Sequence, residues 1–473
     1  MSPSLVRRAA SRAVLALAVA ACARAGGTPP TVTPAASGDG AALALVAAVD
    51  RVAALPLWPG FALARTPLAL YDGERTLLVR HPAPPAGYAP LAGRADVAVR
   101  PGRDPAATAN TSAPIAGVST AIVLLDAAAQ APLAARAALV AHEAFHVFQR
   151  ARHPRWQANE ATLFTYPVDD APALARRLGE DEALRRALAA SDDAGARCWA
   201  RVALGERAAR FARLDSLSGG DASAYERGSE LNEGLAQWVQ WRAAAMAPAL
   251  PADAWPATAM RERAYAVGGT LAALLERTMP AWRDTLEAQP RDSATALDVL
   301  LARALARTPD AGAACALDAA AREAHAARAT TMAGGVAAAR AEARARVVGP
   351  PGWRVVVESP RGALSLQGFD PLNVLRVAPA EVVHRRMLTL GGAAGGVELL
   401  GTAALTEGAP GGHPLFAGVR RVTSEALRAA PVVRDSAGTT LVEAPGLRVH
   451  ARGAALDTVA RAAGARDLRV RLP

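Results

Sequence analysis

The chain has 473 residues, enough for two or three domains, and its hydrophobic fraction of 52% excludes wholesale disorder. The formal net charge is +10, and every basic residue is an arginine. These arginines alternate with acids in stretches such as GERAARFARLD, which predicts solvated helix faces and not a basic patch. Aromatic residues make up only 4% of the chain, too few for base-stacking surfaces, so we expect no nucleic-acid partner.

Residues 1–22 have the layout of a secretory signal peptide. Three arginines precede the apolar run AVLALAVAA, which is too short to span a bilayer as a stable helix. The run ends in Val19-Ala20-Ala21-Cys22, which resembles a bacterial lipobox with an acylated cysteine; ordinary cleavage at an Ala-x-Ala site is the alternative. We therefore expect an exported protein in the cell envelope. It would be anchored to the membrane by a lipid on Cys22, or else periplasmic or secreted.

A flexible tether is predicted over residues 23–40, which are rich in Gly, Pro, Ser and Thr. A short helix and several strand-like runs follow, including FALARTPLALY, TLLVRH and STAIVLLD. From about residue 130 to 345 the apolar spacing is helical, so residues 41–349 are predicted to form one mainly helical domain with a small sheet. The cysteines Cys198 and Cys315 can form a disulfide in an exported protein, but their spacing does not show whether they meet.

The pattern changes after Pro350. Short alternating or apolar runs between Gly and Pro turns predict an all-β domain over residues 350–473, whose role the pattern does not indicate. The predicted fold class is therefore α+β: a mainly helical domain with a small sheet, followed by a C-terminal all-β domain. No segment after the signal is long and apolar enough for a transmembrane helix.

The segment HEAFH contains the chemistry-bearing residues of the helical domain. His142 and His146 are four apart and lie on one helix face, so both imidazoles can bind one metal ion. Glu143 lies one step round the helix, where a carboxylate can act as a general base on a metal-activated water. The flanking residues are uncharged, as expected for a helix buried below an active site. The alternative is a core helix with two satisfied histidines.

Three downstream glutamates compete for the place of a third ligand. Glu160 follows His146 by about 14 residues, a short distance for a second helix to return across the metal. Glu230 and Glu233 lie three apart in ELNEGLAQWVQW. Gly234 permits close approach of the HExxH helix, which favours Glu233 as the ligand. Glu230 is then expected to orient a ligand histidine through its free ring nitrogen.

Together, HEAFH and NEGLA resemble the gluzincin branch of the zinc metallopeptidases. The resemblance covers these two motifs and the strand before the first. It implies that His142, His146 and Glu233 bind Zn²⁺ and that Glu143 is the base. The interval of roughly 85 residues between the motifs is longer than in compact members, which predicts a helical insertion. The chain lacks the G-A-M-E-N segment of one aminopeptidase family, so exopeptidase action is unsupported.

Such sites often contain a tyrosine or histidine that stabilises the oxyanion. Tyr265 is the candidate and Tyr225 its rival, with an ordinary half-buried tyrosine as the alternative for either. The predicted function is zinc-dependent hydrolysis of a peptide or protein substrate. The alternative is a non-catalytic envelope lipoprotein that keeps a zincin-like fold for binding or structure. An intact Glu143 favours the enzyme, because a structural zinc needs no base.

Overall fold

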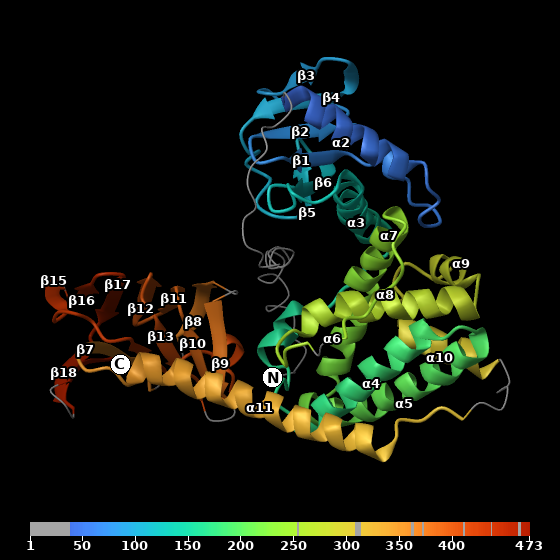
Figure 1. Ribbon diagram of the computed structural model, residues 1–473. Coiled ribbons are helices and arrows are strands. Elements are labelled where there is room, and N and C mark those ends of the chain that lie inside the picture. The colour runs from blue at the N-terminus through green and yellow to red at the C-terminus, as the bar shows by residue number, and fades with distance from the viewer. Residues whose placement is uncertain are drawn as a thin grey trace. The chain divides into compact units, whose positions relative to one another are not determined.

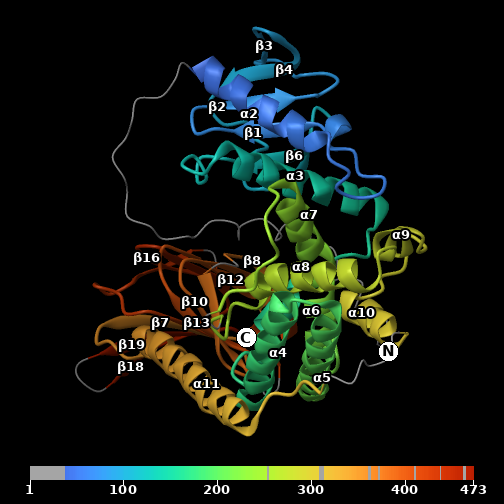
Figure 2. The same ribbon diagram turned by 45° about the vertical axis from the view of Figure 1, so that its right-hand side comes forward.

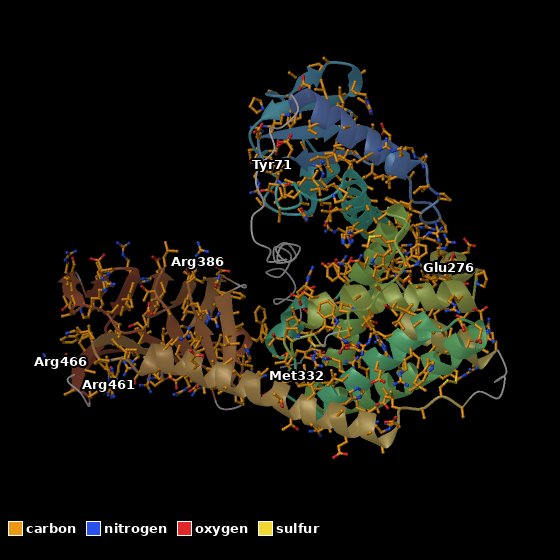
Figure 3. The ribbon with its side chains drawn as sticks, viewed as in Figure 1. Tyr71, Glu276, Met332, Arg386, Arg461 and Arg466 are labelled. Atoms are coloured by element: carbon orange, nitrogen blue, oxygen red, sulfur yellow. A yellow bond between two sulfur atoms is a disulfide. The ribbon has the colours of Figure 1, made fainter. Side chains whose placement is uncertain are left out.

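The computed structural model describes residues 38–473, except 253–254, 308–313, 361–363, 371–372, 410–411, 437 and 462–464. The predicted signal peptide, with Cys22, and most of the predicted tether lie outside these residues. The chain divides into two compact units, Met1–Met332 and Ala333–Pro473, which we call the first unit and the β unit. Met332 lies within helix α11, Ala319–Val348 (Figure 3). The predicted boundary at 349/350 comes directly after this helix. The α+β class with a C-terminal β domain is confirmed.

The first unit contains a six-stranded sheet in the order β3-β4-β2-β1-β6-β5 (Figure 1). Its strands are β1 Leu68–Tyr71, β2 Arg75–Val79, β3 Ala89–Leu91, β4 Arg94–Pro101, β5 Thr111–Ile115 and β6 Val118–Leu124. Strands β1 and β6 are parallel, and the other neighbours are antiparallel. Strand β5 therefore forms one edge of the sheet. The predicted strand runs correspond to β1, β2 and β6, with a 3₁₀ turn at Leu63–Arg65 before β1.

Helices α2, Gly38–Ala53, and α3, Leu133–Arg152, share a core with this sheet. Leu70 and Val123 of the strands belong to that core, as does Ala141 of α3. Next to them, four buried indoles pack edge to face; they are Trp58, Trp156, Trp238 and Trp282. This apolar packing fixes the position of α3, because a large buried aromatic cluster cannot shift without opening cavities.

The rest of the first unit is helical, as predicted. Helices α4, Ala171–Ala189, and α5, Asp193–Ser218, lie side by side in both Figure 1 and Figure 2 and fill most of the interval between the two motifs. A disulfide joins Cys198 of α5 to Cys315. The elements are a 3₁₀ turn Glu160–Phe164, α4 Ala171–Ala189, α5 Asp193–Ser218, α6 Asp221–Ser229, a π-helical turn Glu230–Gly234, α7 Leu235–Ala243, α8 Met260–Thr278, α9 Trp282–Glu287 and α10 Leu297–Ala306.

The prediction of a solvated face was wrong for two of the three arginines of GERAARFARLD, since only Arg213 is exposed. The side chains of Arg207 and Arg210 on α5 are 2% and 1% exposed. Both donate to the carboxylate of Glu180 on α4: Arg207 Nη1 to Oε1 at 2.8 Å, and Arg210 Nε to Oε2 at 2.9 Å. Arg210 also binds Glu226 of α6. The acids that neutralise these arginines come from other helices, so sequence neighbours could not reveal the burial.

The β unit contains two antiparallel-rich sheets, in the orders β18-β19-β7-β14-β13-β10-β9 and β15-β16-β17-β12-β11-β8. Its elements are β7 Trp353–Glu358, β8 Ser365–Phe369, β9 Val374–Ala378, β10 Glu381–His384, β11 Met387–Gly392, β12 Gly395–Leu400, β13 Ala404–Glu407, α12 Pro414–Ala417, β14 Arg421–Ser424, β15 Val432–Ser436, β16 Thr439–Ala444, β17 Leu447–Arg452, β18 Ala455–Ala460 and β19 Arg466–Arg471. Apolar residues of both sheets form one core. Within the described part of the chain, no helix combines the length and apolar character needed to cross a bilayer.

Candidate metal centre

Helix α3 presents both histidines of HEAFH to one site. His142 and His146 are buried, and their ring centroids lie 4.9 Å apart, as expected for residues one helical turn apart. The helix starts after Pro132, where a proline costs no hydrogen bond, and ends at Arg152. Its buried positions are filled mainly by alanine, valine and phenylalanine, which pack in the core shared with the sheet. The two imidazoles are therefore held by the fold as well as by their spacing.

Glu233 lies on a π-helical turn between α6 and α7. The backbone N–H of Leu235 donates to the carbonyl of Glu230, five residues back, in place of the usual four. Such turns change which residues face a neighbour and are frequent at functional sites. Gly234, the residue after Glu233, lies against Gly268 of α8. An added Cβ on Gly234 would lie 2.5 Å from Cα of Gly268. The prediction that Gly234 permits approach of the HExxH helix was therefore wrong: the helix that approaches Gly234 is α8, Met260–Thr278.

The three predicted ligands meet at one point. Nitrogen and oxygen atoms of His142, His146 and Glu233 all lie within 4.8 Å of one another. Oε2 of Glu233 is 3.2 Å from Nε2 of His146 and 3.7 Å from Nε2 of His142. Two ligand atoms on a tetrahedral zinc, each about 2.0–2.1 Å from the ion, lie about 3.3 Å apart. In the described structure, Nε2 of His142 and Oε2 of Glu233 are buried without a hydrogen-bond partner. These residues therefore fit a divalent metal ion.

The second carboxylate oxygen of Glu233 is occupied by protein donors. Arg261 of α8 donates from Nη2 to Oε1 at 2.7 Å, and its Nη1 lies 2.7 Å from Oε1 of Glu160. Burial disfavours the charged form of Glu233, but His146, His142 and Arg261 outweigh it and hold its pKa well below the usual range. With Oε1 bound to Arg261, only Oε2 is directed to the histidines. Glu233 can therefore supply one oxygen as an anionic ligand.

Glu143 is buried beside the ligands and differs from Glu233 in its surroundings. Its carboxylate makes no hydrogen bond or ion pair with any residue the structure describes. Burial raises the pKa of Glu143 to about 7, and the nearby charge of Glu233 acts in the same direction. Isolated buried carboxylates are costly, and they are concentrated at functional sites. A carboxylate in this position can take a proton from a water molecule at the metal.

Gln149 is a site residue that the sequence reasoning missed. Its Oε1 lies 2.8 Å from Nδ1 of His146, and its Nε2 donates to the carbonyls of Leu231 and Asn232 at 2.9 Å each. Gln149 thus orients a histidine and joins α3 to the π-helical turn. The signal in the sequence was its spacing, three residues after His146 on the same helix.

The orienting role predicted for Glu230 is wrong. Its carboxylate is fully buried and accepts a hydrogen bond from Arg207, within the network of α4, α5 and α6. Burial raises the pKa of Glu230 to about 7, and Arg207 opposes this rise. Glu230 and Glu233 have different neighbours: Arg207 binds Glu230, whereas the two histidines lie beside Glu233. Among the described contacts, Glu230 belongs to this ion-pair network and makes no hydrogen bond to His142, His146 or Glu233.

The structure brings Tyr265 to the site and places the other candidates near its margin. The ring of Tyr265 stacks on His142, with centroids 5.8 Å apart and an interplanar angle of 8°. The Tyr225 hydroxyl is 3.5 Å from Oε2 of Glu160, in a separate aromatic cluster. Glu160 lies in the 3₁₀ turn after α3, where it binds Arg261, so it is not the third ligand beside the histidines. Tyr265 is thus the tyrosine in contact with a ligand residue.

Protein-family models, curated proteins and solved structures were all compared with this chain, and none matches it. We therefore infer the function from the geometry and chemistry of the site alone.

Proposed function

We propose that this protein is a zinc-dependent peptidase in which His142, His146 and Glu233 hold the metal ion. The observation that carries the proposal is the convergence of three buried ligand atoms beside an unpaired buried carboxylate, that of Glu143. A structural metal site needs the first feature but not the second, because its coordination is closed by protein ligands. A histidine pair with two glutamates of different roles suits metal-assisted hydrolysis.

The bound metal ion would polarise the substrate carbonyl and lower the pKa of a water molecule to about 7. Glu143 would accept a proton from the attacking water molecule while the oxygen of that water bonds to the substrate carbonyl carbon. Glu143 then delivers the proton to the amide nitrogen, the C–N bond breaks, and a carboxylic acid and an amine leave. Tyr265, beside His142, is the proposed hydrogen-bond donor to the developing oxyanion.

Arg261 is proposed to keep Glu233 in a one-oxygen binding mode. Its guanidinium joins Oε1 of Glu233 to Glu160, so the carboxylate cannot rotate freely. Gln149 has the same effect on His146. Such partners commonly change metal affinity by about 10–100-fold when removed, because they fix the orientation of a ligand.

We also propose that the protein is exported and anchored by a lipid on Cys22. The disulfide between Cys198 and Cys315 supports an oxidising compartment, since such bonds are rare in the cytosol. Mass analysis of the mature N-terminus tests the anchor: an acylated Cys22 is expected. An unmodified N-terminus at Arg24 or beyond would contradict it.

Metal content and peptide hydrolysis test the function together. The purified protein should contain about one zinc ion per chain and cleave members of a mixed-peptide pool. A chelator should stop cleavage, and added zinc should restore it. The matched control is Glu143→Gln, which keeps the shape of the side chain and should retain zinc without cleaving. Zinc binding without cleavage of any peptide would favour a non-catalytic role, and absence of zinc binding would reject the site.

A further inference from the structure

Arg150 lies on the same face of α3 as the metal-site residues. It follows His146 by four residues and Glu143 by seven, which is one and two helical turns. The electrostatic influence of Arg150 reaches both Glu143 and Glu233, so the guanidinium is near the site and not only on its helix. Arg150 is nevertheless exposed to solvent. A cation that is both solvent-accessible and close to the metal ligands can meet a substrate.

Arg150 differs from the other arginine that acts on Glu143. Arg261 is bound to two carboxylates, those of Glu160 and Glu233. Arg150 has no carboxylate within ion-pair distance among the residues that the structure describes; its hydrogen bonds go to Ser112, at 3.1 Å to the carbonyl and also to the hydroxyl. These bonds use Nη1 alone. Nε and Nη2 make no hydrogen bond with any residue that the structure describes. Together they form a fork that can bind a carboxylate through two parallel hydrogen bonds.

The contact with Ser112 places Arg150 at the edge of the sheet. Ser112 is opposite Ala121 in the β5–β6 pair, and the N–H of Ala121 donates away from β5, to Pro67. The pair is therefore of the non-hydrogen-bonded kind, so the N–H and C=O of Ser112 point outward from the edge strand. Arg150 reaches this outward carbonyl. An extended peptide that adds to the β5 edge would pass directly beside the guanidinium.

We propose that Arg150 selects substrates that carry a carboxylate close to the cleaved bond. This inference rests on the proposed peptidase function and adds its substrate class. The carboxylate can belong to an acidic side chain or to the C-terminus of the peptide, and both present the same two oxygens to the fork. The carboxylate would replace water on Arg150 and would neutralise its positive charge. No carboxylate among the described residues lies within ion-pair distance of Arg150 to do so.

Paired peptides test the proposal in the full chain loaded with zinc. One pair differs only by Glu or Gln at each position flanking the cleaved bond; the other differs only by a free or an amidated C-terminus. The wild-type protein should show a higher kcat/KM for the acidic member of one pair, which identifies the source of the carboxylate. Arg150→Gln should lower that preference about tenfold. We expect a smaller effect than for a buried ion pair, because Arg150 is exposed to solvent. Arg150→Lys should have an intermediate preference.

Arg152→Gln is the matched control. Arg152 is on the same helix, two residues on and so on a different face, and its partner is Glu287. This variant removes the same charge and should keep the wild-type preference. Zinc content should be measured for all variants, and binding of the labelled peptide pairs to Glu143→Gln, with and without Arg150→Gln, gives a readout that does not require turnover.

Two results would overturn the selectivity proposal. The first is equal kcat/KM of the wild-type protein for the members of both pairs. The second is an equal loss for acidic and neutral peptides in Arg150→Gln, which would mean that Arg150 acts through Glu143 or Ser112. Absence of cleavage of every peptide is a different outcome, because it rejects the proposed function itself and the selectivity with it.

Discussion

Replacement of Gly234 by alanine should disturb the candidate metal site, although Gly234 has no side chain to bind a metal ion. The new Cβ would lie 2.5 Å from Cα and 2.9 Å from the carbonyl carbon of Gly268, and neither backbone atom can rotate away. Carbon atoms pack at about 3.5 Å or more, so the π-helical turn and α8 must separate locally by about 1 Å. Overpacking of this kind costs about 1–3 kcal/mol, and we expect a net loss near 2 kcal/mol because alanine also favours the helix.

The same displacement should weaken metal binding. Glu233 is the residue before Gly234, and its Oε2 must stay near 3.2–3.7 Å from the two imidazole nitrogens. Metal–ligand distances tolerate only about 0.2 Å of error, whereas the helix must move by about 1 Å. We expect zinc affinity to fall at least about tenfold, comparable to the loss of a residue that orients a ligand.

Chemical denaturation and zinc titration measure the two effects. Gly205→Ala is the matched control, because Gly205 lies on α5 and an added Cβ there meets no atom within 4 Å. That change should stabilise the protein by about 0.5–1 kcal/mol and leave zinc affinity unchanged. A Gly234→Ala protein as stable as Gly205→Ala, with wild-type zinc affinity, would refute the argument that this glycine contact positions Glu233.

Three further predictions concern individual side chains. Glu143→Gln should retain zinc by metal analysis and reduce peptide turnover at least about a hundredfold; unchanged turnover would remove the general base from the mechanism. Glu233→Ala should abolish tight zinc binding in a titration. Glu230→Ala should instead destabilise the fold by about 3–5 kcal/mol, because Arg207 loses a buried partner. If Glu230→Ala abolished zinc binding and Glu233→Ala did not, the assignment of Glu233 as the ligand would be wrong. In the β unit, burial lowers the pKa of His384 from 6.5 to about 4, so the unfolded chain binds the proton first. The contribution of His384 to the free energy of unfolding should therefore be fully present above about pH 6.5 and should fall by up to about 3 kcal/mol toward pH 4, as measured by chemical denaturation at each pH. A His384→Leu protein that keeps the same pH dependence would contradict this assignment.

Local spacing in the sequence was sufficient to predict the part of the candidate metal site that lies on α3. His142 and His146 share a helix face because positions four apart always do, and Glu143 lies beside them for the same reason. The α+β class could also be predicted, since helical and strand periodicities depend on which side chains alternate between core and solvent. These features need no knowledge of distant contacts.

Tertiary structure alone decided how the distant residues reach the candidate site. Glu233 meets His146 across 87 residues because Gly234 and Gly268 allow two helices into backbone contact. The role of Gln149 depends on carbonyls of the π-helical turn, which no spacing on α3 reveals. The burial of Arg207 likewise depends on acids from other helices. Each of these interactions joins groups far apart in the chain, and their geometry exists only after the helices have packed.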